Sequence, residues 1–323
     1  MRVVALDAAT LEGGAVSLAA IEQVADELIR HPATPAGALP QRVAGAQVLI
    51  TNKVPVGAAA MDAAPDLELV CIAATGTNVV DLRAAAARGI AVCNVPGYAT
   101  QAVAQYTLAL LMALATRWHE SMRLVHAGAW SRAPNFCLTD FPSTELEGRA
   151  LGVVGYGAIG RRFARMAEGL GMQVLVAERR GAKPRAGRVA FDELLERVDV
   201  LSLHCPLTGD THGMIGAPEL AALGSQGWLI NTARGALVDE MALARALRDG
   251  TLGAAALDVI SDEPPPPQHP LLATDLPRLL VTPHCAWASD QARQRLVDVI
   301  AANIRAFRDG ASLNRVEQVL NDR

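Results

Sequence analysis

Charged and aromatic residues are scarce in this chain of 323 residues. Charged side chains account for 19% of the sequence and aromatic ones for 4%, whereas 51% of the residues are hydrophobic. Such a composition excludes an intrinsically disordered protein, and the length suffices for two domains with their own cores. Because the formal net charge is −4, neither nucleic acid nor an anionic membrane surface is expected as the main partner.

Long hydrophobic runs and paired cysteines are also missing. The most apolar stretch, 108–115, has eight residues, whereas a membrane-spanning helix needs about 20. The N-terminal segment turns polar at Asp7, unlike the apolar core of a signal peptide. No CxxC pair occurs, and the odd number of cysteines supports neither a zinc site nor a disulfide framework. We therefore expect a cytoplasmic protein with reduced thiols, no bound metal and no membrane partner.

Short apolar runs recur along the chain and are separated by amphipathic stretches. In the first third of the chain, the runs that predict strands are 3–6, 48–51, 67–74 and 90–95. The second series of predicted strands comprises 150–155, 172–178, 198–205, 227–233, 252–259 and 279–285. Such alternation is typical of α/β proteins, in which helices cover both faces of a parallel sheet. The sequence therefore predicts two such α/β units.

Several helices can be predicted by residue. In the first series they are expected over 16–30 and 79–88. Between the two series, a long helix is predicted over about 101–126, followed by an irregular segment at 127–147 that contains two prolines. A final helix is expected over about 288–309.

A glycine-rich turn, GYGAIG, follows the strand predicted at 150–155 and opens a helix. The G-x-G-x-x-G pattern in this context is typical of a dinucleotide-binding turn. Gly155 permits the tight turn, Gly157 lets the backbone approach a pyrophosphate, and Gly160 lets the helix pack on the strand. The amides near Ala158 and Ile159 would then face the phosphates. Because Ala158 has no polar side chain, contacts there would come from the backbone.

The next strand ends at Glu178, 18 residues after Gly160. An acidic residue about 20 residues after the turn binds the 2′-hydroxyl of the adenosine ribose. Glu178 therefore favours NAD over NADP. Arg179 and Arg180 follow directly and could instead bind a 2′-phosphate, so NADP remains the alternative.

Three polar residues follow the last strands of the second series. Arg234 comes just after one strand, Glu263 lies in the proline-rich loop after the next, and His284 follows the last. Ligands of open α/β sheets bind at the carboxyl ends of the strands. Arginine can bind a carboxylate with two parallel hydrogen bonds, and histidine can transfer a proton near neutral pH. These residues therefore predict hydride transfer to a keto acid.

Taken together, the motifs resemble those of the D-isomer-specific 2-hydroxyacid dehydrogenases, and within them those of glycerate dehydrogenases (hydroxypyruvate reductases). The matching segments, which cover nearly the whole chain in order, are TGTNVVDL (75–82), GIAVCNVPGYAT (89–100), VVGYGAIG (153–160), HCPLT (204–208), NTARGALVDE (231–240), ALDVISDEPP (256–265) and TPHCAWAS (282–289).

The resemblance implies roles for the three polar residues. Arg234 would bind the carboxylate and carbonyl of the substrate and also lie near the cofactor. His284 would be the general acid in reduction and the base in oxidation, next to both substrate and cofactor. Glu263 would hydrogen-bond His284 and favour its protonated form.

Further contacts are implied for the cofactor. Thr232 and Ala233 would contact it, and Asp258 would lie near the nicotinamide carboxamide. Cys205 and Pro206 are assigned to the same site, whereas the preceding His204 is either structural or lines the adenine pocket.

On the substrate side, the resemblance implies that the backbone at Thr75 and Gly76 completes the carboxylate site. Asn52, with Lys53, could reach substrate hydroxyls or form a plain surface turn. Trp287 could shape the substrate pocket or simply pack.

The resemblance also implies the domain organisation. A Rossmann NAD-binding domain over 100–285 would be inserted in a flavodoxin-like substrate-binding domain formed by 1–99 and 286–323. A homodimer is usual for the family.

The sequence is compatible with other functions as well. Glyoxylate reductase is close in chemistry, whereas 3-phosphoglycerate dehydrogenase and formate dehydrogenase fit the sequence less well. A protein of another class, a catalytically silent co-repressor that responds to NAD, would retain the fold without turnover.

Overall fold

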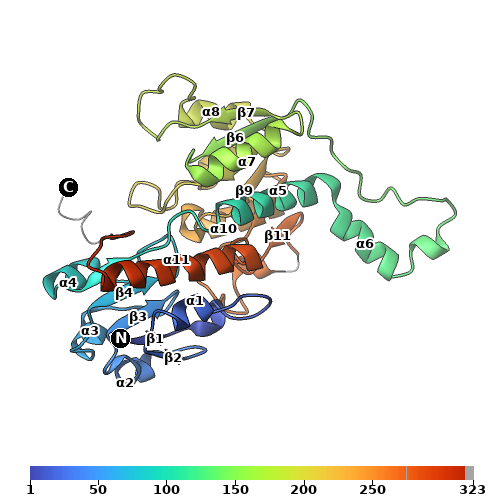
Figure 1. The fold of residues 1–323 in the computed structure, drawn as a ribbon. Helices are drawn as coiled ribbons and strands as arrows, with labels where there is room; N and C mark the ends of the chain where they lie inside the picture. Colours follow the sequence, from blue (N-terminus) through green and yellow to red (C-terminus); the bar gives the residue numbers. More distant parts are fainter. Residues whose placement is uncertain (274, 317–323) are drawn as a thin grey trace. The chain divides into compact units, whose positions relative to one another are not determined.

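The computed structural model describes residues 1–273 and 275–316, and the chain forms two compact units (Figure 1). Unit 1 comprises Met1–Ala99 and the chain from Ala288 on, and unit 2 comprises Thr100–Trp287. The second crossing between units falls two residues later than the expected boundary after residue 285. The Trp287 indole Nε1 donates to the carbonyl oxygen of His284 at 2.9 Å, which ties this residue to unit 2.

Unit 1 contains a parallel sheet with the strand order β2-β1-β3-β4-β5. Its strands are β1 (Arg2–Ala5), β2 (Glu27–Arg30), β3 (Val48–Thr51), β4 (Leu69–Ile72) and β5 (Ala91–Cys93). Its helices are α1 (Ala19–Glu22), α2 (Leu39–Val43), α3 (Ala58–Asp62), α4 (Leu82–Ala87) and α11 (Asp290–Arg308). The strand order is that of flavodoxin-like doubly wound folds.

Unit 2 contains a second parallel sheet, with the order β11-β10-β9-β8-β6-β7. Its strands are β6 (Ala150–Val154), β7 (Gln173–Val176), β8 (Val200–Leu203), β9 (Trp228–Asn231), β10 (Ala254–Leu257) and β11 (Leu279–Val281). Beyond β7, Ala177 forms a parallel bridge with Val189. If this bridge is counted as a rudimentary strand, the order becomes the 3-2-1-4-5-6 arrangement of Rossmann folds with one further strand.

The helices of unit 2 precede its first strand or lie between its strands. They are α5 (Thr100–Thr116), α6 (Trp118–His126), α7 (Ala158–Glu168), α8 (Phe191–Arg197), α9 (Ala217–Leu223) and α10 (Glu240–Arg248). Short 3-10 turns in the two units cover Ala8–Thr10, Ala36–Ala38, Trp130–Arg132, Gly235–Leu237 and Pro270–Leu272.

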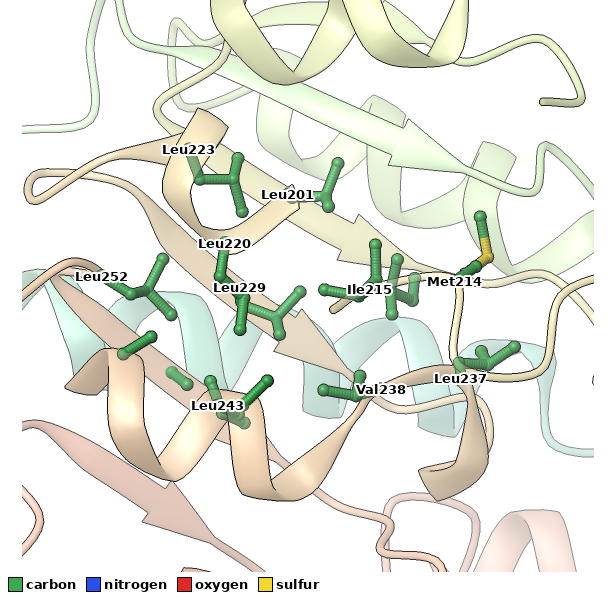
Figure 2. Packing of buried hydrophobic residues seen from close by; sticks show 14 of the residues in the cluster. Leu201, Met214, Ile215, Leu220, Leu223, Leu229, Leu237, Val238, Leu243 and Leu252 are labelled. Carbon is green, nitrogen blue, oxygen red and sulfur yellow. The ribbon is translucent and has the colours of Figure 1, made fainter. Parts of the chain in front are cut away.

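The core of unit 2 has a layer on each face of its sheet, as strand alternation requires. Along β9, Leu229 packs into the layer with α9 and α10, whereas Trp228 and Ile230 pack into the layer with α5 and α7. Figure 2 shows the first layer, in which Leu220 and Leu243 lie near Leu229. Burying a leucine stabilises the fold by about 1.5–3 kcal/mol. Packing on both faces therefore stabilises the sheet.

Two predicted helices differ from the structure. The segment 16–30 was expected to be one helix, but it contains α1 and then the strand β2. Residues of β2 pair with β1 from Arg2↔Glu27 onward, so sheet pairing outweighs the local helical pattern. The helix expected over 101–126 ends at Thr116 and resumes as α6, because Arg117 has a left-handed φ of 53°.

Candidate active site

The polar residues singled out in unit 2 follow the carboxyl ends of its strands. Gly155 follows β6, Glu178 follows β7, His204 follows β8, and the segments after β9, β10 and β11 carry Arg234, Glu263 and His284. In a parallel sheet these ends share one edge, so the fold collects residues from distant parts of the sequence there.

The glycine-rich turn lies between β6 and α7. A Cβ on Gly155, whose φ is 91°, would lie 2.4 Å from the backbone nitrogen of Cys205. A Cβ on Gly160 would lie 2.1 Å from the carbonyl oxygen of Gly155. These two glycines are therefore required by packing.

The middle glycine of the turn has a different environment. Gly157 is the N-cap of α7, and nothing lies within 4 Å of a Cβ built on it. The free amides of the following helix start at Ala158 and Ile159. Open space before a helix N-terminus suits an anion that must approach the backbone closely, so the turn fits the pyrophosphate of a dinucleotide.

His204 and Cys205 follow β8 and lie beside this turn. The imidazole of His204 forms a 2.9 Å hydrogen bond with the hydroxyl of Ser202, and its ring lies 5.4 Å from that of Phe163. Burial lowers the pKa of His204 to about 4 and raises the pKa of the Cys205 thiol to about 11. Both side chains are therefore neutral near pH 7, and His204 packs against the core of unit 2.

Glu178 forms an ion pair that was not expected from the sequence. Arg185 donates from Nε and Nη2 to the two carboxylate oxygens of Glu178, at 2.6 and 2.7 Å. The amides of Arg179 and Arg185 also donate to this carboxylate, at 3.0 and 3.3 Å. The Arg185 guanidinium is the main cause that lowers the pKa of Glu178 to about 2. Any hydroxyl that bound this carboxylate would have to share or replace one of these donors.

Of the two arginines considered for a 2′-phosphate, Arg180 is engaged elsewhere. Its guanidinium lies 2.7 Å from the buried carboxylate of Glu219 and 3.5 Å from that of Asp192, and it stacks on the ring of Phe191. The cation that pairs with Glu178 is Arg185, which sequence reasoning missed.

The segment after β9 presents Arg234 to solvent. The side chain of Asn231 holds this turn by donating to the carbonyl oxygen of Arg234 at 2.8 Å and accepting from the amide of Ala233 at 3.0 Å. The hydroxyl of Thr232 lies 2.9 Å from that of Thr107 in α5. Over the described residues, no carboxylate pairs with the exposed guanidinium of Arg234, which leaves it able to bind an anion.

Glu263 and His284 are joined by a short hydrogen bond. Oε2 of Glu263 lies 2.5 Å from Nδ1 of His284, and Oε1 accepts from the amide of Ile260 at 3.1 Å. Because an ionised carboxylate only accepts hydrogen bonds, Nδ1 is the donor and Nε2 is directed away from the pair. This is the arrangement of a proton-transferring histidine oriented by an acid.

Asp258 holds the turn that carries His284. This buried carboxylate accepts from the hydroxyl of Thr282 at 2.6 Å and from the amides of Cys285 and Ala286 at 3.0 and 2.8 Å. The amide of His284 donates to the carbonyl oxygen of Asp258 at 2.8 Å. These bonds sustain the left-handed φ of 50° at His284, which a residue with a Cβ rarely adopts. The resemblance had suggested only a cofactor contact for Asp258.

The candidates in unit 1 lie after β3 and β4. Asp7 accepts hydrogen bonds from the amides of Asn52, Lys53 and Val54, and these bonds fix the conformation of the turn at Asn52. After β4, the hydroxyl of Thr75 donates to the carbonyl oxygen of Val95 at 2.9 Å. Over the described residues, the amides of Thr75 and of Gly76 have no acceptor, so both are available to an anion.

Two further kinds of site concern metals and membranes. Among the described side chains, no group of three or more His, Cys, Asp and Glu residues could hold a metal ion. Of the helices in residues 1–273 and 275–316, none has the length and hydropathy that crossing a bilayer requires.

The chain is similar in sequence to known proteins. The sequence model of the family described as "D-isomer specific 2-hydroxyacid dehydrogenase, NAD binding domain" matches residues 108–286. The chain is 44% identical to a glycerate dehydrogenase of Methylorubrum extorquens over 277 residues, which is 86% of this chain and 87% of the relative.

Two solved structures are similar over almost the whole chain. The TT0316 protein from Thermus thermophilus has 38% sequence identity and a TM-score of 0.83, with 98% of this chain and 100% of that chain covered. An NADPH-dependent glyoxylate/hydroxypyruvate reductase from Sinorhizobium meliloti has 31% identity and a TM-score of 0.80, with 98% and 97% covered.

Proposed function

The chain belongs to the D-isomer specific 2-hydroxyacid dehydrogenases, and we propose that it interconverts hydroxypyruvate and D-glycerate with NADH and NAD. As a member of this family it is an oxidoreductase that acts on the CH–OH group of a 2-hydroxy acid with a nicotinamide cofactor. The finer assignment of the substrate is supported by the 44% identity to a glycerate dehydrogenase.

The 2.5 Å hydrogen bond between Glu263 and His284 is the observation that carries the proposed mechanism. The reduced nicotinamide supplies a hydride to the keto carbon when it is bound. His284 donates a proton from Nε2 to the ketone oxygen, and in the reverse direction it accepts the hydroxyl proton. Glu263 keeps the imidazole oriented and stabilises its protonated form. Together these transfers convert the ketone to an alcohol.

Arg234 binds the substrate carboxylate in this proposal. Arg234 follows β9, and its guanidinium is exposed. The neighbouring strand β10 leads to Glu263. A planar guanidinium can donate two parallel hydrogen bonds to a carboxylate and thereby fix the orientation of the adjacent keto group. In unit 1, the amides of Thr75 and Gly76 are proposed to donate to the substrate carboxylate as well. Asn52 and Trp287 are proposed to contact the substrate as well.

For the cofactor, the turn from Gly155 to Gly160 is proposed to hold the pyrophosphate and Glu178 the adenosine ribose. The open space at Gly157 and the acid after β7 support these assignments. Contacts from Cys205, Pro206, Thr232, Ala233 and Asp258 are also proposed. We infer a preference for NADH, because the carboxylate of Glu178 would repel a 2′-phosphate.

A homodimer is proposed from the apolar surface of α6 and the segment after it. Trp118, Met122 and Val125 are exposed and share one face of α6 because they are four and three residues apart. Trp130 is half exposed and Phe136 is 90% exposed. None of the α6 residues is buried, and Figure 1 shows that helix extending from the sheet of its own unit. A second copy of the chain would cover this surface.

A cytoplasmic location is proposed as well. None of the five cysteines, all of which lie within the described residues, forms a disulfide bond, as is expected for a reducing compartment.

The first test is the initial rate of NADH oxidation by the purified protein. Hydroxypyruvate, glyoxylate, pyruvate and 3-phosphohydroxypyruvate would be compared, and each would be repeated with NADPH. We expect the highest kcat/KM for hydroxypyruvate with NADH. A higher value for glyoxylate would replace the substrate assignment. Tight NADH binding without turnover of any keto acid would instead favour a catalytically silent binding protein.

A further inference from the structure

Glu263 lies in the loop 260–272. Two consecutive amides of this loop donate hydrogen bonds to two different carboxylates. The amide of Ile260 donates to Oε1 of Glu263 at 3.1 Å. The next amide, that of Ser261, donates to Oε1 of Glu240 at 2.6 Å. Glu240 is the first residue of α10, so the start of the loop is tied to a regular element of unit 2.

The other oxygen of Glu240 binds the far part of the same loop. Its Oε2 lies 3.0 Å from Nε2 of His269, and both side chains are largely buried. Nδ1 of His269 accepts a hydrogen bond from the amide of Leu271 at 3.3 Å. Because Nδ1 is the acceptor, the ring proton lies on Nε2 and is donated to Glu240. One carboxylate therefore joins Ser261 to His269 across the loop.

The segment that carries Arg234 packs against the same peptide. A Cβ on Gly235 would lie 1.9 Å from the carbonyl carbon of Ile260 and 2.3 Å from the amide nitrogen of Ser261. No side chain fits at this position. Gly235 thus packs against the Ile260–Ser261 peptide. Glu240 accepts a hydrogen bond from the amide of Ser261, and Glu263 accepts one from the amide of Ile260.

From this arrangement we infer that Glu240 and His269 are positioning residues for the proton-transfer pair. They fix the loop so that the amide of Ile260 donates to Oε1 of Glu263, which leaves Oε2 to accept from His284. The inference rests on the proposed function of Glu263 and His284. Neither Glu240 nor His269 touches the reacting atoms in this assignment, and both act through the carboxylate of Glu263.

The test uses His269→Ala and the conservative His269→Gln. Alanine removes the donor to Glu240, whereas the glutamine amide can occupy the position of Nε2 and donate in its place. We expect His269→Ala to lower the upper pH midpoint of keto-acid reduction by about 0.5–1 unit, in the direction expected for loss of the Glu263 contact. His269→Gln should restore most of the shift. His212→Ala, at an exposed histidine of unit 2, is the matched control.

A readout without turnover separates this inference from the proposed function. The C2 proton of His284, assigned by comparison with His284→Asn, would be titrated by NMR in each protein without substrate. The midpoint should fall in His269→Ala and return in His269→Gln. If the wild type does not reduce any keto acid, the proposed function fails while this titration still tests the loop.

A double variant and an isosteric variant complete the design. In a Glu263→Gln background, His269→Ala should cause no further shift, because the carboxylate through which it acts is gone. Glu240→Gln keeps the size of the side chain but places its amide against the donor of His269, so it should shift the midpoint in the same direction. A lower melting temperature with wild-type midpoints in all variants would overturn the inference and leave a purely structural contact.

Discussion

His284 and Glu263 are separated by 20 intervening residues, yet Nδ1 of the histidine lies 2.5 Å from Oε2 of the glutamate. The two residues come from the segments after adjacent parallel strands, β11 and β10. The sheet therefore supplies the proximity, and the backbone bonds of Asp258 and Ile260 supply the orientation. An acid that holds a histidine in this way leaves the second ring nitrogen directed away from the pair, as a proton-transfer role requires.

Replacing the acid should change the pH dependence more than the geometry. In Glu263→Gln the side-chain carbonyl can still accept from Nδ1 of His284, but the negative charge that favours the imidazolium is lost. We expect the upper pH limit of hydroxypyruvate reduction to move down, with kcat about tenfold lower at alkaline pH. Initial rates from pH 5 to 10 would measure this. A profile that coincides with that of the wild type would exclude the proposed role of Glu263.

Replacing Arg234 should affect the keto acid and not the dinucleotide. Lysine keeps the charge but cannot donate two parallel hydrogen bonds in a plane. For Arg234→Lys we expect KM for hydroxypyruvate to rise roughly 10- to 100-fold, the scale of losing a hydrogen bond to a charged group. The dissociation constant of NADH, measured by calorimetry, should change less than twofold. Weakening of both ligands to the same extent would contradict the assignment.

Arg185 should determine how strongly the chain discriminates against NADPH. In Arg185→Gln the carboxylate of Glu178 loses its main cation and would repel a 2′-phosphate more strongly, whereas it becomes more available to the ribose hydroxyls. We expect the ratio of dissociation constants, NADPH over NADH, to rise about tenfold. Lys183→Gln, which removes a positive charge from the same loop, is the control. Equal changes in both constants would show that Arg185 has no part in the choice.

The half-buried His204 should make the stability of the protein sensitive to acid. Its pKa is about 4 in the folded state, below the usual 6.5, so the unfolded chain binds the proton first as pH falls. The group therefore costs stability progressively between pH 6.5 and 4, up to about 3 kcal/mol in the free energy of unfolding. His204→Gln should flatten this part of the curve, as measured by urea unfolding at pH 5 and 7. A variant with the wild-type slope would assign the acid sensitivity to other groups.

The exposed face of α6 should be needed for self-association. Trp118→Glu combined with Met122→Glu places two charges on this face, and we expect the mass in light scattering to fall from that of a dimer to that of a monomer. Leu170→Glu changes an apolar residue of lower exposure elsewhere in unit 2 and is the control. A wild-type protein that is monomeric at micromolar concentration would remove the basis of the dimer proposal.

Much of the fold follows from sequence pattern. The strands of both sheets, apart from β2, were predicted because buried parallel strands form short apolar runs, and the turn at Gly155 was predicted because its glycines are sterically required. The helix expected over 16–30 was wrong because the pairing of β2 with β1 depends on a strand more than 20 residues away. The break at Arg117 was missed because a single left-handed residue leaves no trace in hydrophobic periodicity.

For the candidate site, too, the residues were predictable from the sequence pattern, whereas their long-range contacts were not. Arg234, Glu263 and His284 could be proposed because each follows a predicted strand, which fixes the edge where it lies. The contacts that hold them were not predictable, since Glu240 and Ser261 or Asp258 and Ala286 meet only in the folded chain. The five cations between residues 179 and 188 are visible in the sequence, but only the structure identifies Arg185 as the partner of Glu178.

The chain leaves unit 1 at Ala99 and returns to it at Ala288, and this order has a consequence for synthesis on the ribosome. Helix α11, which packs on α1 and β4, is made after the whole of unit 2, so the nascent unit 1 lacks one of its covering layers until unit 2 has been synthesised. Unit 2 is a continuous segment and can fold as soon as it emerges. A stalled chain that ends near residue 287 would thus expose the apolar surface of the first sheet and be a substrate for chaperones and proteases.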